Sequence, residues 1–367
     1  MSTSRLPAWV PPILIIAGVG LLLFGGLSLF TSQPANFTPN TPAVPNPTAT
    51  LQVALAPTPL PSATLAVPSP TPIAPSPLAT PTSSPPTSTL IAPSPSALAS
   101  ASALTFNGDL AYQQLLAQTA IGPRPTGSEA GWATGDYIIA ELEKMGWQVE
   151  TEEFLFKGVK GRNVVGRLGS GPIIILGAHY DTRPAADQDP DPAKRGEWIE
   201  GANDGASGVA VLLELARTLE AGKLQHEVWL AFFDAEDRGR LDGWPFSVGA
   251  RQMAENLTVA PEGVIVVDMI GDADQNIYLE QNSTPALREE IWAVAGELGY
   301  ETHIIPELRH TIIDDHIPFL ERGIPAIDII DFDYPYWHTV ADTADKVAPA
   351  SLERVGRTLE VWLEEKQ

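Results

Sequence analysis

Charge is distributed along this chain in two unequal parts, and that division decides which part can fold. Residues 6–108 contain no Asp, Glu, Lys or Arg, so every charged side chain except Arg5 lies in residues 109–367. The whole chain has 45 acidic and 22 basic residues. The charged part is long enough to bury a substantial core. Its acidity argues against nucleic acid as a partner.

The uncharged part contains two different segments. Residues 8–30 are apolar or small, and this length is near the roughly 20 residues that span a bilayer. We expect a transmembrane signal anchor there, with residues 1–7 as a short cytoplasmic tail and the folded part outside the cytoplasm at the cell membrane. The alternative is secretion after signal cleavage. Residues 31–103 are rich in Pro, Ser, Thr and Ala and predict a disordered stalk.

The absence of cysteine narrows the chemistry of the folded part. Disulfides, thiolate–metal sites and thiol nucleophiles are all excluded. A bound metal would therefore be held by histidine and carboxylate side chains.

Strand and helix patterns alternate through residues 104–367. Continuous apolar runs, typical of strands buried on both faces, predict strands at 163–169, 172–181, 227–235, 263–271 and 324–331. Helical spacing predicts helices at 128–145, 205–222, 285–299 and 349–365. This order predicts a single α/β domain with a central, mostly parallel mixed β-sheet flanked by helices on both faces. Ligands of such folds bind beyond the carboxyl ends of the strands.

Histidine and carboxylate side chains lie at or just after the carboxyl ends of four of these strands. They are His179 and Asp181, Glu236 and Asp237, Asp268, and His338, and Asp204 lies just before a predicted helix. Any one of them could be an ordinary loop or capping residue. Together they form the donor set of a divalent-cation site, and a cation would also neutralise the crowded carboxylates. Zinc suits imidazole and carboxylate ligands best, and manganese and cobalt stay open.

Several of these segments resemble one known family. They are GAHYD, EGANDGASGVAVLLELARTL, FFDAED, VVDMIG, DDHIPFLERGIPA and YWHT. Over about residues 110–367 the chain resembles metallopeptidase family 28, which unites co-catalytic zinc aminopeptidases with glutaminyl-peptide cyclotransferases. The resemblance implies the zinc aminopeptidase fold, of phosphorylase/hydrolase type. The DDHIPFLERGIPA and YWHT segments are more similar to the cyclotransferase branch.

The resemblance implies a metal-ligand role for five residues: His179, Asp204, Asp237, Asp268 and His338. Asp204 resembles the carboxylate that bridges two metals or binds the only one. Asp237 stands where the family usually has Glu. Asp268 resembles a ligand of the second metal in the aminopeptidases and an acid behind the ligands in the cyclotransferases.

The resemblance also implies roles around the metal. Asp181 resembles the acid that orients the ring of His179, and Glu236 resembles the catalytic general acid/base. Asp314 would join the proton network of Glu236. Trp337 would wall the substrate pocket, and Trp244 is matched to a second pocket tryptophan.

Three functions stay open at this point. The first is a glutaminyl-peptide cyclotransferase, which converts an N-terminal Gln to pyroglutamate with release of ammonia and would bind one zinc. The second is an aminopeptidase that hydrolyses the first peptide bond and would bind two. Both act on peptide or protein N-termini. The third is a catalytically inactive, membrane-tethered binding ectodomain.

Overall fold

The computed structural model describes residues 105–365. The predicted cytoplasmic tail, signal anchor and stalk (residues 1–103) lie outside the described residues, so these assignments stay predictions. Within the described range, no helix combines the length and the apolar character that crossing a membrane requires.

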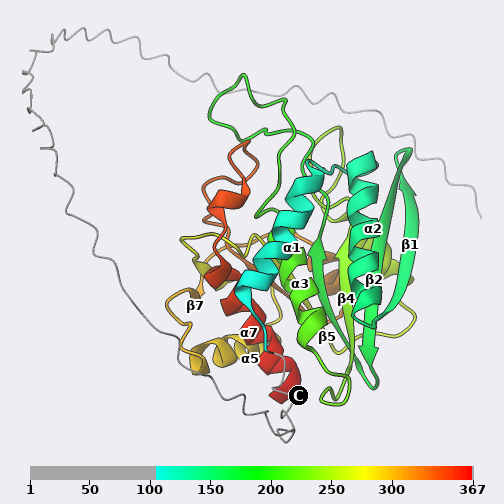
Figure 1. The fold of residues 1–367 in the computed structure, drawn as a ribbon, viewed down its shortest axis with the longest axis vertical. Coiled ribbons are helices and arrows are strands. Elements are labelled where there is room, and N and C mark those ends of the chain that lie inside the picture. The colour runs from blue at the N-terminus through cyan, green and yellow to red at the C-terminus, as the bar shows by residue number, and fades with distance from the viewer. Residues whose placement is uncertain (1–104, 366–367) are drawn as a thin grey trace, which may run out of the picture. The chain divides into compact units, whose positions relative to one another are not determined.

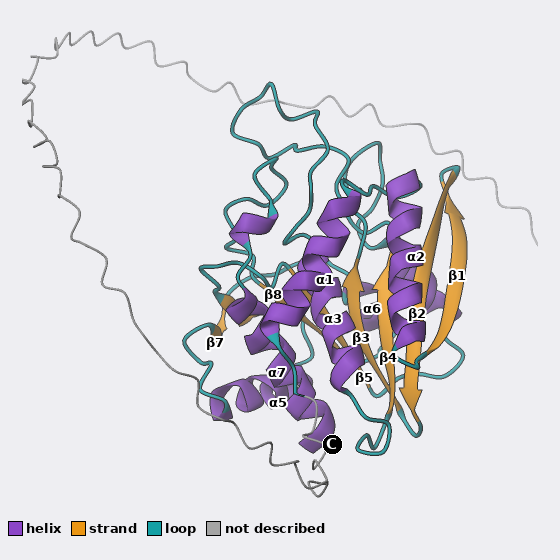
Figure 2. Ribbon diagram, viewed as in Figure 1, coloured by secondary structure: helices purple, strands orange, loops and turns teal. Residues whose placement is uncertain are grey.

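A six-stranded sheet forms the centre of the domain (Figures 1 and 2). In spatial order its strands are β1 (Gln148–Phe156), β2 (Val159–Gly169), β4 (Glu227–Phe233), β3 (Ile173–His179), β5 (Gly263–Asp268) and β8 (Ala326–Ile330). The last four strands are parallel, whereas β2 pairs antiparallel with both β1 and β4. The prediction of a mostly parallel mixed sheet is confirmed. A separate parallel pair consists of β6 (Ile277–Leu279) and β7 (Ile304–Leu308).

Helices cover both faces of this sheet. One face carries α1 (Gly108–Ile121), α2 (Glu129–Lys144), α3 (Ala206–Thr218), α5 (Pro285–Glu297) and α7 (Pro349–Glu365). The other face carries α4 (Val248–Asn256) and α6 (Ile317–Glu321). A short 3₁₀ helix (Ala344–Lys346) precedes α7. Figure 2 shows α1, α2 and α3 together in front of the strands.

The alternation of side chains along β3 explains the continuous apolar runs. Ile174 and Leu176 pack into the core on the α3 side, whereas Ile175 packs into the core that contains Phe319 of α6. Because both faces are covered, every position must be apolar. Each fully buried aliphatic side chain contributes roughly 1.5–3 kcal/mol to folding.

The sequence pattern gives no prediction for several elements at the periphery, namely α1, β1, α4, α6, β6 and β7. Asn107 caps α1, its side chain accepting the Leu110 N–H, and Ser128 caps α2 in the same way through the Gly131 N–H. The strand predicted from residue 163 begins at Val159, because residues 159–162 complete the hairpin with β1.

Candidate active site

The ends of the parallel strands bring the predicted site residues to one edge of the sheet. His179 is the last residue of β3, and Asp268 is the last residue of β5. Glu236 and Asp237 follow β4 closely, and Asp204 lies just before α3. All of them, and His338, are buried, between 1% and 7% exposed. The edge predicted from the sequence is therefore where these side chains meet.

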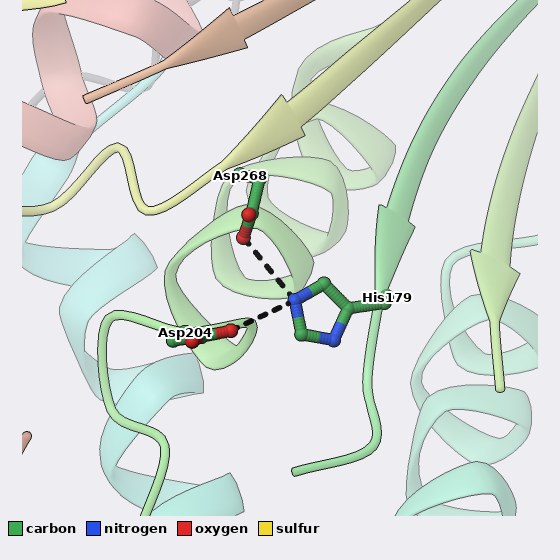
Figure 3. A group of neighbouring side chains, drawn as sticks. All are labelled: His179, Asp204 and Asp268. Atoms are coloured by element: carbon green, nitrogen blue, oxygen red, sulfur yellow. Dashed lines mark hydrogen bonds and ion pairs between the residues drawn. The ribbon is translucent and has the colours of Figure 1, made fainter. Parts of the chain in front are cut away.

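Three of the side chains form a first metal-compatible group around His179 (Figure 3). Nε2 of His179 lies 3.1 Å from Oδ1 of Asp204 and 3.2 Å from Oδ1 of Asp268. Nδ1, the other ring nitrogen, lies 3.1 Å from the backbone oxygen of Asp181. This contact leaves Nε2 to face the two carboxylates.

The carboxylate of Asp181 contacts the backbone after β4 as well as the ring of His179. Its Oδ1 is 3.7 Å from Nδ1 of His179, so the backbone oxygen of the same residue is the nearer partner of the ring. The two carboxylate oxygens accept the N–H groups of Glu236 at 3.0 Å and Asp237 at 3.2 Å. Asp181 thus fixes the backbone that carries the candidate base and ligand.

A second metal-compatible group shares Asp204 with the first and adds Asp237 and His338. Nε2 of His338 lies 2.9 Å from Oδ1 of Asp237 and 3.6 Å from Oδ2 of Asp204. The two oxygens of Asp204 therefore face different histidines. This is the arrangement expected of a carboxylate that either bridges two cations or binds one.

The contacts of these oxygens leave them able to bind a cation. Apart from the ion-pair contacts with His338 and Arg183, neither carboxylate oxygen of Asp237 nor Oδ2 of Asp204 has a hydrogen-bond partner, although all three atoms are buried. Buried carboxylate oxygens without partners are costly. Zinc ligation would offset that cost, and the imidazole and carboxylate donors fit zinc. The site accommodates one cation or two.

The surrounding carboxylates raise the pKa values of the two histidines. Burial alone lowers a histidine pKa, but Asp268 and Asp204 raise the pKa of His179, and Asp237 raises the pKa of His338 to about 9. Metal binding displaces such protons, because histidine coordinates in its neutral form. Zinc binding is therefore expected to weaken as the pH falls.

Glu236, the predicted proton carrier, lines the cavity beside these groups. Burial raises its pKa well above the ordinary value, and the negative charge of Asp314 raises it further. Glu236 and Asp314 line the same cavity. A cation held nearby would lower the pKa of Glu236 again and bring it toward the range useful for acid–base catalysis.

The cavity above these groups is small, about 180 Å³. Apolar and aromatic side chains form much of its wall, among them Phe246, Ile313, Phe332 and Trp337. Trp337 stacks on the ring of His338, with centroids 3.8 Å apart. Trp337 thus lies where a wall residue of the pocket was predicted.

Trp244 does not line this cavity, which corrects the position expected for it. Its ring is buried against Phe156, with centroids 4.8 Å apart, and the Arg238 guanidinium lies over it. The reason is a tight turn, in which the Trp244 N–H donates to the Leu241 carbonyl and directs the indole toward the hairpin side. Phe246, two residues later, is the aromatic side chain that reaches the cavity.

Arg183 and Asp187 belong to the site but were not predicted. Arg183 is buried and donates to both carboxylate oxygens of Asp187, at 2.6 and 3.0 Å. It also donates to the backbone oxygens of Asp237 and Gly239. Oδ1 of Asp187 in turn lies 3.5 Å from Nδ1 of His338. The position of an arginine soon after a candidate ligand, in HYDTRP, was the available signal.

A third buried group lies behind Asp314 and contains Asp328 and His316. Nε2 of His316 lies 3.5 Å from Glu280, a carboxylate that accepts the N–H groups of Asn282 and Ile312. Burial raises the pKa of Asp328 well above its ordinary range, and Asp314 adds to the effect. This group was not foreseen, apart from Asp314, because Asp328 and the neighbouring Glu280 come from segments separate from the one that holds Asp314 and His316.

An α/β sheet with two metal-compatible groups at its carboxyl edge fits a metal-dependent enzyme, and comparison with known proteins agrees. Residues 163–363 match the family described as Peptidase family M28. The chain belongs to this family. Its sequence is most similar to the glutaminyl cyclase branch, as predicted.

Individual relatives illustrate both branches. The chain is 26% identical over 287 residues to the glutaminyl-peptide cyclotransferase-like protein of Bos taurus, covering 66% of this chain and 72% of that protein. The glutaminyl cyclase of Tannerella forsythia is 34% identical, with a TM-score of 0.68 over 72% of this chain and 100% of that one. A leucine aminopeptidase precursor of Bacteroides thetaiotaomicron is 31% identical, with a TM-score of 0.69 over 72% and 99%.

Proposed function

We propose that this protein is a zinc-dependent glutaminyl-peptide cyclotransferase, which converts an N-terminal Gln to pyroglutamate. The observation that carries the proposal is the placement of Glu236 and Asp314 in one small cavity beside Trp337. Cyclisation consumes no water, so a confined cavity with aromatic walls suits it. The family relatives named glutaminyl cyclase support the same assignment.

The reaction is an exchange of one C–N bond for another. The α-amine nitrogen of the substrate attacks its side-chain amide carbon, the new ring bond forms, and the bond to the departing nitrogen breaks. Glu236 takes the proton from the attacking amine and passes it to the departing nitrogen, which leaves as ammonia. Asp204, Asp237 and His338 would hold a zinc ion, which would supply Lewis-acid polarisation of the side-chain carbonyl.

Asp314 and the cavity wall have supporting roles in this proposal. The charge of Asp314 opposes ionisation of Glu236 and raises its pKa, which makes Glu236 a stronger base toward the attacking amine. The indole of Trp337 packs against the substrate and holds its amine near Glu236. Proximity of amine and amide within one bound residue accounts for much of the rate gain.

The test is product analysis with the purified protein and a glutaminyl peptide. Mass spectrometry should show a peptide whose mass is lower by one ammonia and whose first peptide bond is intact. The Glu236→Gln variant should retain zinc and lose this product. Full activity in that variant would remove Glu236 from the mechanism.

A specific observation also favours an aminopeptidase as the second candidate. The two oxygens of Asp204 face both histidine groups, so the site accommodates a pair of cations. In that reaction Glu236 would deprotonate a water for attack on the first peptide bond. The membrane location implied by residues 8–30 stays a separate proposal, independent of the choice between these reactions.

A further inference from the structure

Arg240 differs from every other residue at the cavity. Five of the lining residues are acids, namely Asp204, Glu236, Asp237, Asp268 and Asp314, and Arg240 is the only Lys or Arg among the described residues that line it. An arginine at the wall of an acidic cavity would attract an anionic group that the rest of the cavity repels.

Arg240 is also exposed and has no ion pair among the residues that the structure describes. The two nearby arginines are each paired with an aspartate. Arg183 is bound to Asp187, and Nη2 of Arg238 lies 2.7 Å from Asp242. The Arg240 guanidinium is therefore available to a ligand. Phe246, over whose ring it lies at 5.6 Å, holds it at the cavity wall.

The local backbone fixes this position. Arg240 has a backbone φ of +65°, a value that residues other than Gly rarely adopt. Its N–H donates to the Trp244 carbonyl at 2.8 Å. The Leu241 N–H donates to the Arg238 carbonyl within the same turn. The turn thus presents the guanidinium to the cavity, at a backbone conformation that carries some cost.

We infer that Arg240 is a specificity residue that binds a substrate carboxylate next to the N-terminal residue, so that the preferred substrates are peptides with an acidic second residue. This inference rests on the proposed action on peptide N-termini. A planar guanidinium suits a carboxylate, with which it forms paired hydrogen bonds. The same chemistry would accept the terminal carboxylate of a dipeptide.

The test compares peptides that differ only in charge. Glutaminyl-glutamyl, glutaminyl-alanyl and glutaminyl-lysyl peptide amides are offered to the purified protein, with the free acid Gln-Ala as a further arm. The glutamyl peptide should exceed the alanyl peptide by about fivefold in kcat/KM, mainly through KM. A similar increase in kcat/KM for the free acid Gln-Ala over its amide would show that Arg240 also binds the terminal carboxylate of a dipeptide.

Arg240→Gln should erase this preference, Arg240→Glu should reverse it in favour of the lysyl peptide, and the Arg238→Gln control should keep it. Equal glutamyl-to-alanyl ratios in the wild type and Arg240→Gln would overturn the inference. The dissociation constants of the glutamyl and alanyl peptides are also compared in the zinc-loaded Glu236→Gln variant, because binding can be measured there without turnover. Failure of cyclisation would therefore be distinguishable from failure of the charge preference.

Discussion

Oδ1 of Asp237 lies 2.9 Å from Nε2 of His338, although Asp237 has one methylene fewer than the glutamate usual at its position. Arg183 explains how the shorter side chain reaches the site. It donates to the Asp237 backbone oxygen at 3.0 Å, and it also binds Asp187, which faces the other nitrogen of His338. One buried arginine thus holds both the carboxylate and the residue behind the imidazole.

Removing the charge behind His338 should weaken zinc binding. Asp187→Asn is expected to raise the zinc Kd by about 10- to 100-fold, because groups that orient a ligand imidazole contribute to metal affinity on that scale. Chelator competition measures the Kd. Asp191→Asn, in the same loop but away from His338, is the control. An unchanged Kd in Asp187→Asn would show that Asp187 does not support the metal site.

The number of zinc ions should depend on two aspartates in different ways. Asp268→Asn is expected to leave one zinc per chain, because Asp204, Asp237 and His338 form a complete group without it. Asp204→Asn is expected to lose that zinc. Elemental analysis of the purified variants gives the count. A fall from two zinc ions to one in Asp268→Asn would contradict the single-zinc account and favour the aminopeptidase.

Glu280 should stabilise the fold in a pH-dependent way. Burial on its own raises the pKa of Glu280, but His316 and the N–H groups of Asn282 and Ile312 lower it to about 2 from the ordinary 4.5. A depressed acid pKa stabilises the folded state above pH 4.5, and this contribution is lost as the pH falls toward 2. Glu280→Gln should therefore lower the free energy of unfolding by roughly 3 kcal/mol at pH 7.

Denaturant unfolding at pH 7 and at pH 4 checks this prediction. The difference between wild type and Glu280→Gln should be smaller at pH 4, and the exposed control Glu289→Gln should show no such difference. A constant difference across this range would mean that Glu280 contributes through packing alone.

Close contact between α3 and β5 predicts the effect of a single methyl group. A Cβ at Gly208 would lie 2.4 Å from the Val267 carbonyl oxygen, whereas one at Gly222 would meet nothing within 4 Å. Gly208→Ala should destabilise the protein by about 1–3 kcal/mol through overpacking. Gly222→Ala is the control, and denaturant unfolding of both variants is the measurement. Equal stability in the two variants would show that α3 shifts to admit the methyl group.

The predictable parts of this molecule are those with a strong local pattern. The apolar run ending in His179 identifies a strand buried on both faces, and Asp268 ends another, so the edge where the predicted ligands meet could be foreseen. Asp187 could not, because its relation to His338 depends on how a long loop folds back over the site. Trp244 and Phe246 show the same limit, since the turn between them decides which ring enters the cavity.

The central claim is tested most directly by offering the purified, zinc-loaded protein a glutaminyl amide and a leucyl amide in parallel. Ammonia release with formation of a pyroglutamyl product from the first, and no cleavage of the second, is the predicted result. Cleavage of the leucyl amide without any pyroglutamyl product would contradict the cyclotransferase assignment and identify the protein as an aminopeptidase.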